Sequence, residues 1–130
     1  MSLHKHYNPN PHKNRNGDCT ARAICKATGK TWDQVYTALC AYGFAEKDYP
    51  NANVIWGQYL YDLGFCQHLI REYWKHTVED FCREHPEGTY ILAIGDHVVC
   101  VDGGFYWDSW DSGQEIPIFY WTKEGSGADS

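Results

Sequence analysis

Cys19 has the residue type and the sequence position of a nucleophile. A thiol attacks as its thiolate, and the pKa of a thiol falls at the start of a helix, where unpaired backbone N–H groups favour negative charge. Cys19 follows Asp18, which is a preferred N-cap residue. Apolar residues then recur at helical spacing, at Ala23, Ile24 and Ala27. The pattern predicts a helix that begins at Cys19, whose own N–H is then available to an oxyanion.

His97 is the histidine that the pattern favours as the general base for this thiol. Of the seven histidines in the chain, it alone lies within strongly β-patterned sequence. Residues 102–105, Asp-Gly-Gly-Phe, follow it and are a strong hairpin signal in which the two glycines form the turn. That turn predicts that residue 102 pairs with 105 and residue 99 with 108. His97 would then lie opposite Trp110.

Asp108 is the carboxylate expected to orient His97. The predicted register places four side chains on one face of the hairpin: His97, Val99, Asp108 and Trp110. Asp108 lies diagonal to His97 there, and a carboxylate in that position would hold the imidazole in one tautomer and stabilise its charged form. Asp111 is the alternative. It points to the opposite face in this register, but a one-residue change in the loop would reverse the choice.

The surrounding pattern predicts an α+β protein in which N-terminal helices pack on a C-terminal antiparallel sheet. Capping residues and glycines indicate helices over 19–28, from Thr31 to near Gly43, over about 52–63, and from Thr77 towards Pro86. β-Branched and aromatic runs indicate a meander of strands at 89–94, 98–101, 105–109 and 116–121. We expect an extended arm at 1–17, one domain at 18–122 and a flexible tail at 123–130.

Composition excludes several classes of function. With 130 residues, of which 43% are hydrophobic, the chain is expected to form one globular domain. A net charge of -6 without a basic run argues against a nucleic-acid partner. No apolar stretch resembles a signal peptide or a membrane span, so a cytoplasmic protein without a membrane partner is expected. The oligomeric state is left open.

The sequence implies no metal ion or cofactor. His4-Lys5-His6 and the pair Cys82 and His85 are the nearest approach to a metal site, but zinc needs four convergent ligands and no C-x-x-C motif occurs. Gly103-Gly104 is too short to cradle a phosphate, and a strand rather than a helix follows it.

Two segments resemble known cysteine hydrolases. Asp108-Ser109-Trp110, which follows His97, is similar to the Asn-Ser-Trp segment after the catalytic histidine of papain-like cysteine peptidases. Residues 16–24 are similar to the Asp-Gly-Asn-Cys-x-x-Arg-Ala-Ile signature of ovarian-tumour-type deubiquitinases, with Asn and Asp exchanged. The resemblance implies a papain-like fold and a Cys19–His97–Asp108 triad that Trp110 shields from water. The substrate would be a peptide, an isopeptide or another amide.

The chain departs from the papain-like pattern at the oxyanion site. Lys13 stands where those enzymes carry an oxyanion glutamine, six residues before the cysteine. The amide of Asn16 is the first candidate for the missing donor, and Asn14 is the second. Both residues also suit a turn that they would stabilise by local hydrogen bonds.

Two other functions stay open from the sequence. One is a cell-wall amidase of the related CHAP or NlpC kind, since six tryptophans could line an aromatic groove for such a substrate. The other is a papain-like binding module without catalytic activity, in which the same aromatic surface recognises a partner.

Overall fold

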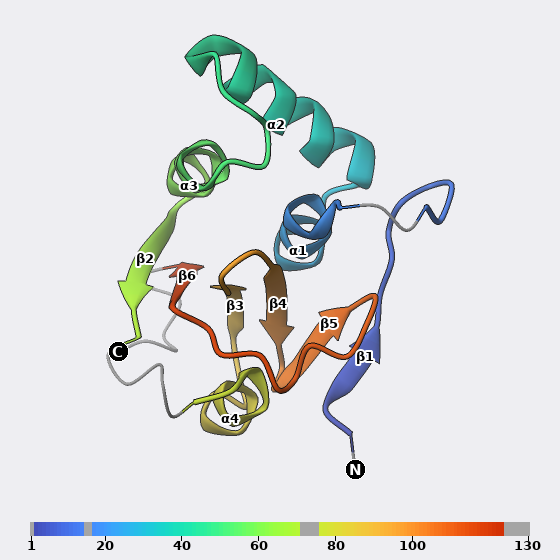
Figure 1. Ribbon diagram of the computed structural model, residues 1–130, viewed down its shortest axis with the longest axis vertical. Helices are drawn as coiled ribbons and strands as arrows, with labels where there is room; N and C mark the ends of the chain where they lie inside the picture. Colours follow the sequence, from blue (N-terminus) through green and yellow to red (C-terminus); the bar gives the residue numbers. More distant parts are fainter. Residues whose placement is uncertain (1, 15–16, 71–75, 124–130) are drawn as a thin grey trace.

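A computed structural model describes residues 2–14, 17–70 and 76–123 of the chain. Within these ranges it has four helices and six strands, coloured along the chain in Figure 1. The helices are α1 (Cys19–Thr28), α2 (Trp32–Glu46), α3 (Asn53–Asp62) and α4 (Val78–Glu84). The strands are β1 (His4–His6), β2 (Phe65–Leu69), β3 (Thr89–Ala93), β4 (Val98–Asp102), β5 (Phe105–Asp108) and β6 (Phe119–Lys123). None of the helices in these ranges is long and apolar enough to cross a membrane.

The strands form one mixed sheet in the order β1-β5-β4-β3-β6-β2, from right to left in Figure 1. β3, β4 and β5 are antiparallel neighbours, as the predicted meander requires. The prediction is wrong for β6, which pairs with β3 and β2 instead of β5. Residues 109–118 return the chain past β4 and β3 to reach that place. Strand periodicity indicates which faces are buried but carries no information about strand order.

The two ends of the chain take part in the sheet more than the sequence predicts. The arm at 1–17 was predicted to contain no element, but His4–His6 form β1, which pairs in parallel with Tyr106–Asp108. A strand of three residues is too short to show an alternating pattern. At the other end, Lys123 belongs to β6 rather than to the predicted tail at 123–130, whose remaining residues lie outside the described ranges.

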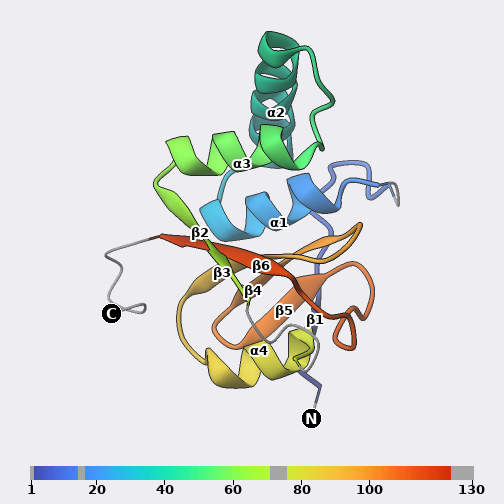
Figure 2. The same ribbon diagram turned by 60° about the vertical axis from the view of Figure 1, so that its left-hand side comes forward.

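Helices cover both faces of the sheet. Figure 2 shows α1, α2 and α3 over one face and α4 over the other. Ile91, Ala93 and Cys100 belong to the apolar cluster under the first three helices. Leu92 and Val99 belong to the cluster under α4. Because successive residues of β3 and β4 face opposite clusters, both faces of these central strands are buried, and the strands are apolar except for Thr89 and Asp102 at one end.

Local sequence signals explain most helix boundaries. The helix starts expected at Thr31 and Thr77 are confirmed, and both are capping boxes, Thr31 with Gln34 and Thr77 with Asp80. α2 continues past Gly43, near which its end was expected, as far as Glu46. Gly43 instead lets the backbone at Asp48 lie close to α2, since a Cβ at position 43 would lie 2.6 Å from the carbonyl oxygen of Asp48. The connection between α2 and α3 therefore packs directly on α2.

Candidate active site

Cys19 is the first residue of α1, as predicted. The helix ends before Gly29, whose left-handed φ of 77° stops it. Asp18 occupies the N-cap position, but its side chain makes no capping hydrogen bond, so that part of the prediction is wrong. Its carboxylate accepts hydrogen bonds from Arg22 Nη1 at 2.7 Å and from the Trp32 indole N–H at 2.9 Å instead. Asp18 thus ties the start of α1 to α2.

The hairpin of β4 and β5 brings His97 next to Asp108. Gly103 and Gly104 have φ angles of 64° and 83°, as a two-residue primed turn requires. The strands pair in the predicted register, with residue 102 opposite residue 105. His97 directly precedes β4, and Asp108 is the last residue of β5. The imidazole Nε2 of His97 lies 2.6 Å from Asp108 Oδ2, and the two groups hydrogen-bond.

The Asp108 carboxylate is fully buried and receives four hydrogen bonds. Oδ2 accepts from His97 and from the Ser112 hydroxyl at 2.6 Å. Oδ1 accepts from Arg22 Nη2 at 2.9 Å and from the Ser109 backbone N–H at 2.8 Å. Burial alone would raise the pKa of Asp108, but these hydrogen bonds and the charges of His97 and Arg22 lower it below its ordinary value. Asp108 is therefore a fixed anion.

Cys19 and His97 form an acid–base pair. Burial would raise the pKa of the Cys19 thiol, but the hydrogen bond and the charge of His97 outweigh it and lower the pKa, with help from the Val98 backbone N–H. Burial also disfavours charge on His97, yet its hydrogen bonds with Asp108 and Cys19 raise its pKa to about 9. These opposite shifts favour a thiolate beside an imidazolium. With Nε2 bound to Asp108, Nδ1 is the ring nitrogen available to the thiol.

Asp111 and Trp110 have separate places beside this pair. Asp111 Oδ1 accepts hydrogen bonds from the Tyr106 hydroxyl at 2.5 Å and from the Gly113 backbone N–H at 3.0 Å, so it is engaged away from His97. The ring centroid of Trp110 lies 4.7 Å from that of His97, at an interplanar angle of 43°. Trp110 is 44% exposed and His97 only 8%, so the indole covers the imidazole on the solvent side.

Cys19 and His97 line one open cavity of about 390 Å³. Three segments form it: the start of α1, the connection from α2 into α3 (residues 49 and 51–53), and residues 94–98 between β3 and β4. A substrate carbonyl placed here would lie between the thiol and the imidazole. The arrangement can therefore perform nucleophilic attack at a carbonyl carbon, with proton transfer by His97.

The sequence-based candidates for the oxyanion donor do not reach this cavity among the described residues. Asn16 lies outside the described residues. Asn14 is exposed, and its backbone carbonyl accepts a hydrogen bond from the Asn8 amide at 3.3 Å. Lys13 lies in the same turn, with its ammonium 2.9 Å from the Asn8 carbonyl oxygen. Asn14 and Lys13 therefore bring no donor to this cavity.

Several residues at this site were not expected there from the sequence. Arg22 could have been recognised from its spacing of four residues after Asp18 on a helix, a common ion-pair spacing. Ser112, which bonds Asp108, follows it by four residues in a turn. Asn51 and Asn53 line the cavity from a connection far from Cys19 in the sequence, and no spacing signal indicates their position.

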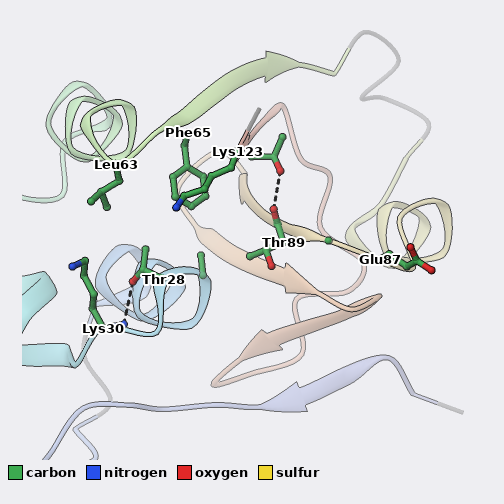
Figure 3. Close-up of a pocket in the computed structure, with 10 residues that line it drawn as sticks. Thr28, Lys30, Leu63, Phe65, Glu87, Thr89 and Lys123 are labelled. Atoms are coloured by element: carbon green, nitrogen blue, oxygen red, sulfur yellow. Dashed lines mark hydrogen bonds between the residues drawn. The ribbon is translucent and has the colours of Figure 1, made fainter. Parts of the chain in front are cut away.

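A larger cavity of about 650 Å³ lies at the opposite end of α1. Figure 3 shows its lining, with Thr28 and Lys30 at the carboxyl end of α1 and Phe65 and Lys123 on β2 and β6. None of the triad residues lines it. Within the described part of the chain, no group of three or more His, Cys, Asp or Glu side chains is arranged to hold a metal ion.

Comparisons with known proteins give no family for this chain. No family model matches the sequence, no curated protein matches it, and no solved structure resembles the fold closely enough to count as a match.

Proposed function

We propose that this protein is a cysteine hydrolase, a peptidase or amidase of papain-like architecture, with Cys19 as nucleophile, His97 as general acid and base, and Asp108 as the orienting carboxylate. The observation that carries the proposal is that Cys19, at the start of α1, lines the same cavity as His97, whose Nε2 is hydrogen-bonded to the buried Asp108. The order of these residues along the chain and the position of Trp110 over His97 agree with the papain-like pattern.

The reaction is acyl transfer through a thioester. The Cys19 thiolate forms a bond to the substrate carbonyl carbon, and the carbonyl electrons move to the oxygen. When they return, the C–N bond breaks and the His97 imidazolium gives its proton to the leaving amine. His97 then takes a proton from water, whose oxygen attacks the thioester, and the carboxylic acid and the free thiol are released. Asp108 stays ionised and holds the imidazole throughout.

A neighbouring cavity favours a chain-like substrate with an apolar group near the cleaved bond. This cavity of about 270 Å³ is lined in part by Trp32, Tyr36 and Leu39. It shares the lining residues Thr20 and Asn51 with the cavity at Cys19, so the two lie side by side. A peptide, an isopeptide or a side-chain amide could place its carbonyl at Cys19 and an apolar side chain between α1 and α2.

The test is the pH dependence of iodoacetamide labelling of the native protein, read for each cysteine by peptide mass spectrometry. Cys19 should react quickly below about pH 7, because its thiolate persists below the ordinary thiol pKa of about 8.5. Cys40 and Cys66, which are also partly exposed, serve as internal controls. His97→Ala should move the labelling profile of Cys19 up towards the ordinary pKa.

The other outcomes separate the alternatives. If Cys19 labels no faster than Cys66, the chain has no activated thiolate, and a papain-like binding module becomes the better description. If Cys19 is activated, turnover of peptidoglycan stem peptides but not of protein-derived peptides would favour a cell-wall amidase.

A further inference from the structure

The amino end of α3 lies at the same cavity as Cys19. Figure 2 shows the first turns of α1 and α3 on one side of the molecule, beside the connection between β3 and β4. Asn53 is the first residue of α3, and it lines the cavity together with Cys19 and His97. An amide side chain therefore stands at the rim of the site where a substrate carbonyl would be attacked.

The orientation of the Asn53 amide is determined by Trp56. The indole N–H of Trp56 donates to Asn53 Oδ1 at 3.0 Å, and the Trp56 side chain is fully buried. An indole N–H is only a donor, so the amide oxygen must face it and the amide NH₂ must point the other way. That NH₂ group has no hydrogen-bond partner among the described residues. Asn53 is exposed, so this oriented donor is open to solvent and to a substrate oxygen that replaces a water molecule.

We propose that Asn53 is a catalytic residue whose Nδ2 donates to the oxyanion of the tetrahedral intermediate, together with the Cys19 backbone N–H. This inference rests on the proposed hydrolase function. It supplies the second donor that Lys13 cannot provide and that Asn14, in its exposed turn, does not bring to the cavity. Asn51 lines the same cavity, but no described hydrogen bond orients its amide, so it is the weaker candidate.

The chemical role follows from where charge develops. As the Cys19 sulfur bonds to the carbonyl carbon, the carbonyl π electrons become a negative charge on oxygen. A donor held in place before the reaction stabilises this charge without reorganisation, which is why one such hydrogen bond is worth about 10²–10³ in kcat. The buried indole of Trp56 provides that fixed support, since it keeps the amide from rotating.

The decisive variant is Asn53→Asp, assayed with a library of fluorogenic peptide amides. Aspartate keeps an oxygen for Trp56 and nearly the same volume, but it loses the NH₂ donor. We expect kcat/KM to fall by about 10²–10³. The limiting rate of Cys19 alkylation by iodoacetamide at high pH should stay unchanged, because that displacement creates no oxyanion. Gln58→Glu makes the same amide-to-acid change on α3, outside the cavity, and should keep turnover within about threefold of the parent protein.

A second variant separates the donor from the added charge. Asn53→Ala removes the NH₂ without introducing a carboxylate, so it should lose turnover to a similar extent even though its melting temperature also falls. The role of Asn53 is refuted if both variants retain kcat/KM within about threefold of Gln58→Glu. If the parent protein shows neither turnover nor rapid Cys19 alkylation, the hydrolase proposal fails, and the role of Asn53 fails with it.

Discussion

The two ends of α1 open onto two cavities of opposite character. The carboxyl end faces the larger one, about 650 Å³, where the charged groups are the exposed side chains of Lys30, Glu87 and Lys123. The amino end faces a cavity of only about 390 Å³, but the charged groups behind it are buried and joined by hydrogen bonds. Exposed charges are screened by water, whereas buried and oriented ones shift each other's pKa values. The organisation of charge, not the volume of a cavity, therefore indicates where chemistry is done.

The largest difference between the two ends should appear when one side chain is removed from each. Cys19→Ala should reduce hydrolysis to background, because none of the other described residues that line the cavity is a cysteine. Its melting temperature should change by no more than a few degrees, since Cys19 is only partly buried. Lys30→Ala at the other end of α1 should leave turnover unchanged. Hydrolysis by Cys19→Ala at more than a trace of the parent rate would contradict the assignment of the nucleophile.

A smaller but still large effect is expected from the cation behind the triad. Arg22 is 5% exposed and bridges Asp18 and Asp108. Arg22→Met would leave the buried Asp18 carboxylate without a counter-charge and Asp108 with His97 as its one cation, which should lower the free energy of unfolding by about 3–5 kcal/mol. The loss of unfolding free energy in Arg22→Lys should lie between those of the parent protein and Arg22→Met, because one ammonium cannot bind both carboxylates as a guanidinium does.

Urea denaturation measures this loss, and Lys30→Met is the matched control at the exposed end of the helix. Its effect should stay within about 0.5 kcal/mol. If Arg22→Met and Lys30→Met were equally stable, the buried network would contribute no more to stability than the exposed charges do.

The smallest effect is a pH dependence of stability that arises from the groups at the amino end of α1. The pKa of His97 is raised from 6.5 to about 9, so its charged form stabilises the fold fully below the first value, and this contribution is lost as the pH rises through the second. Asp108 affects stability at acid pH. Its folded-state pKa is lowered, so the ionised carboxylate stabilises the fold until the pH falls through that lowered pKa. The melting temperatures of the parent and His97→Gln should differ most near about pH 6 and converge near about pH 10. A constant difference between them would refute the raised pKa.

The sequence predicted the positions of Cys19, His97 and Asp108 better than the contacts around them. Gly103 and Gly104 admit few alternatives to a primed two-residue turn, and that turn determines which side chains of β4 and β5 are neighbours. The position of Asp108 beside His97 followed from it. The start of α1 at Cys19 was equally predictable, since a cap position and a terminal glycine bracket an apolar stripe.

The predictions failed where side-chain or strand contacts, rather than local propensity, decide the structure. Asp18 was expected to cap α1, but a carboxylate bonds more strongly to a guanidinium and an indole N–H when tertiary structure brings them close. The orientation of Asn53 depends on a buried Trp56, and the place of β6 depends on which strand edge is free. The contact between Asp18 and Trp32 and the place of β6 leave no periodic or spacing signal in the sequence.

β1 also covers a sheet edge at which two copies of the protein could otherwise pair. Without β1, the backbone of β5 would present unpaired N–H and C=O groups along one edge of the sheet, and such an edge is a template for intermolecular pairing. β1 covers that edge in parallel from His4 to His6, and the Tyr7 N–H extends the pairing to the Asp108 carbonyl at 3.0 Å. The new edge is only three residues long and carries Lys5. The N-terminal arm thus protects the strand that holds Asp108 from edge-to-edge aggregation.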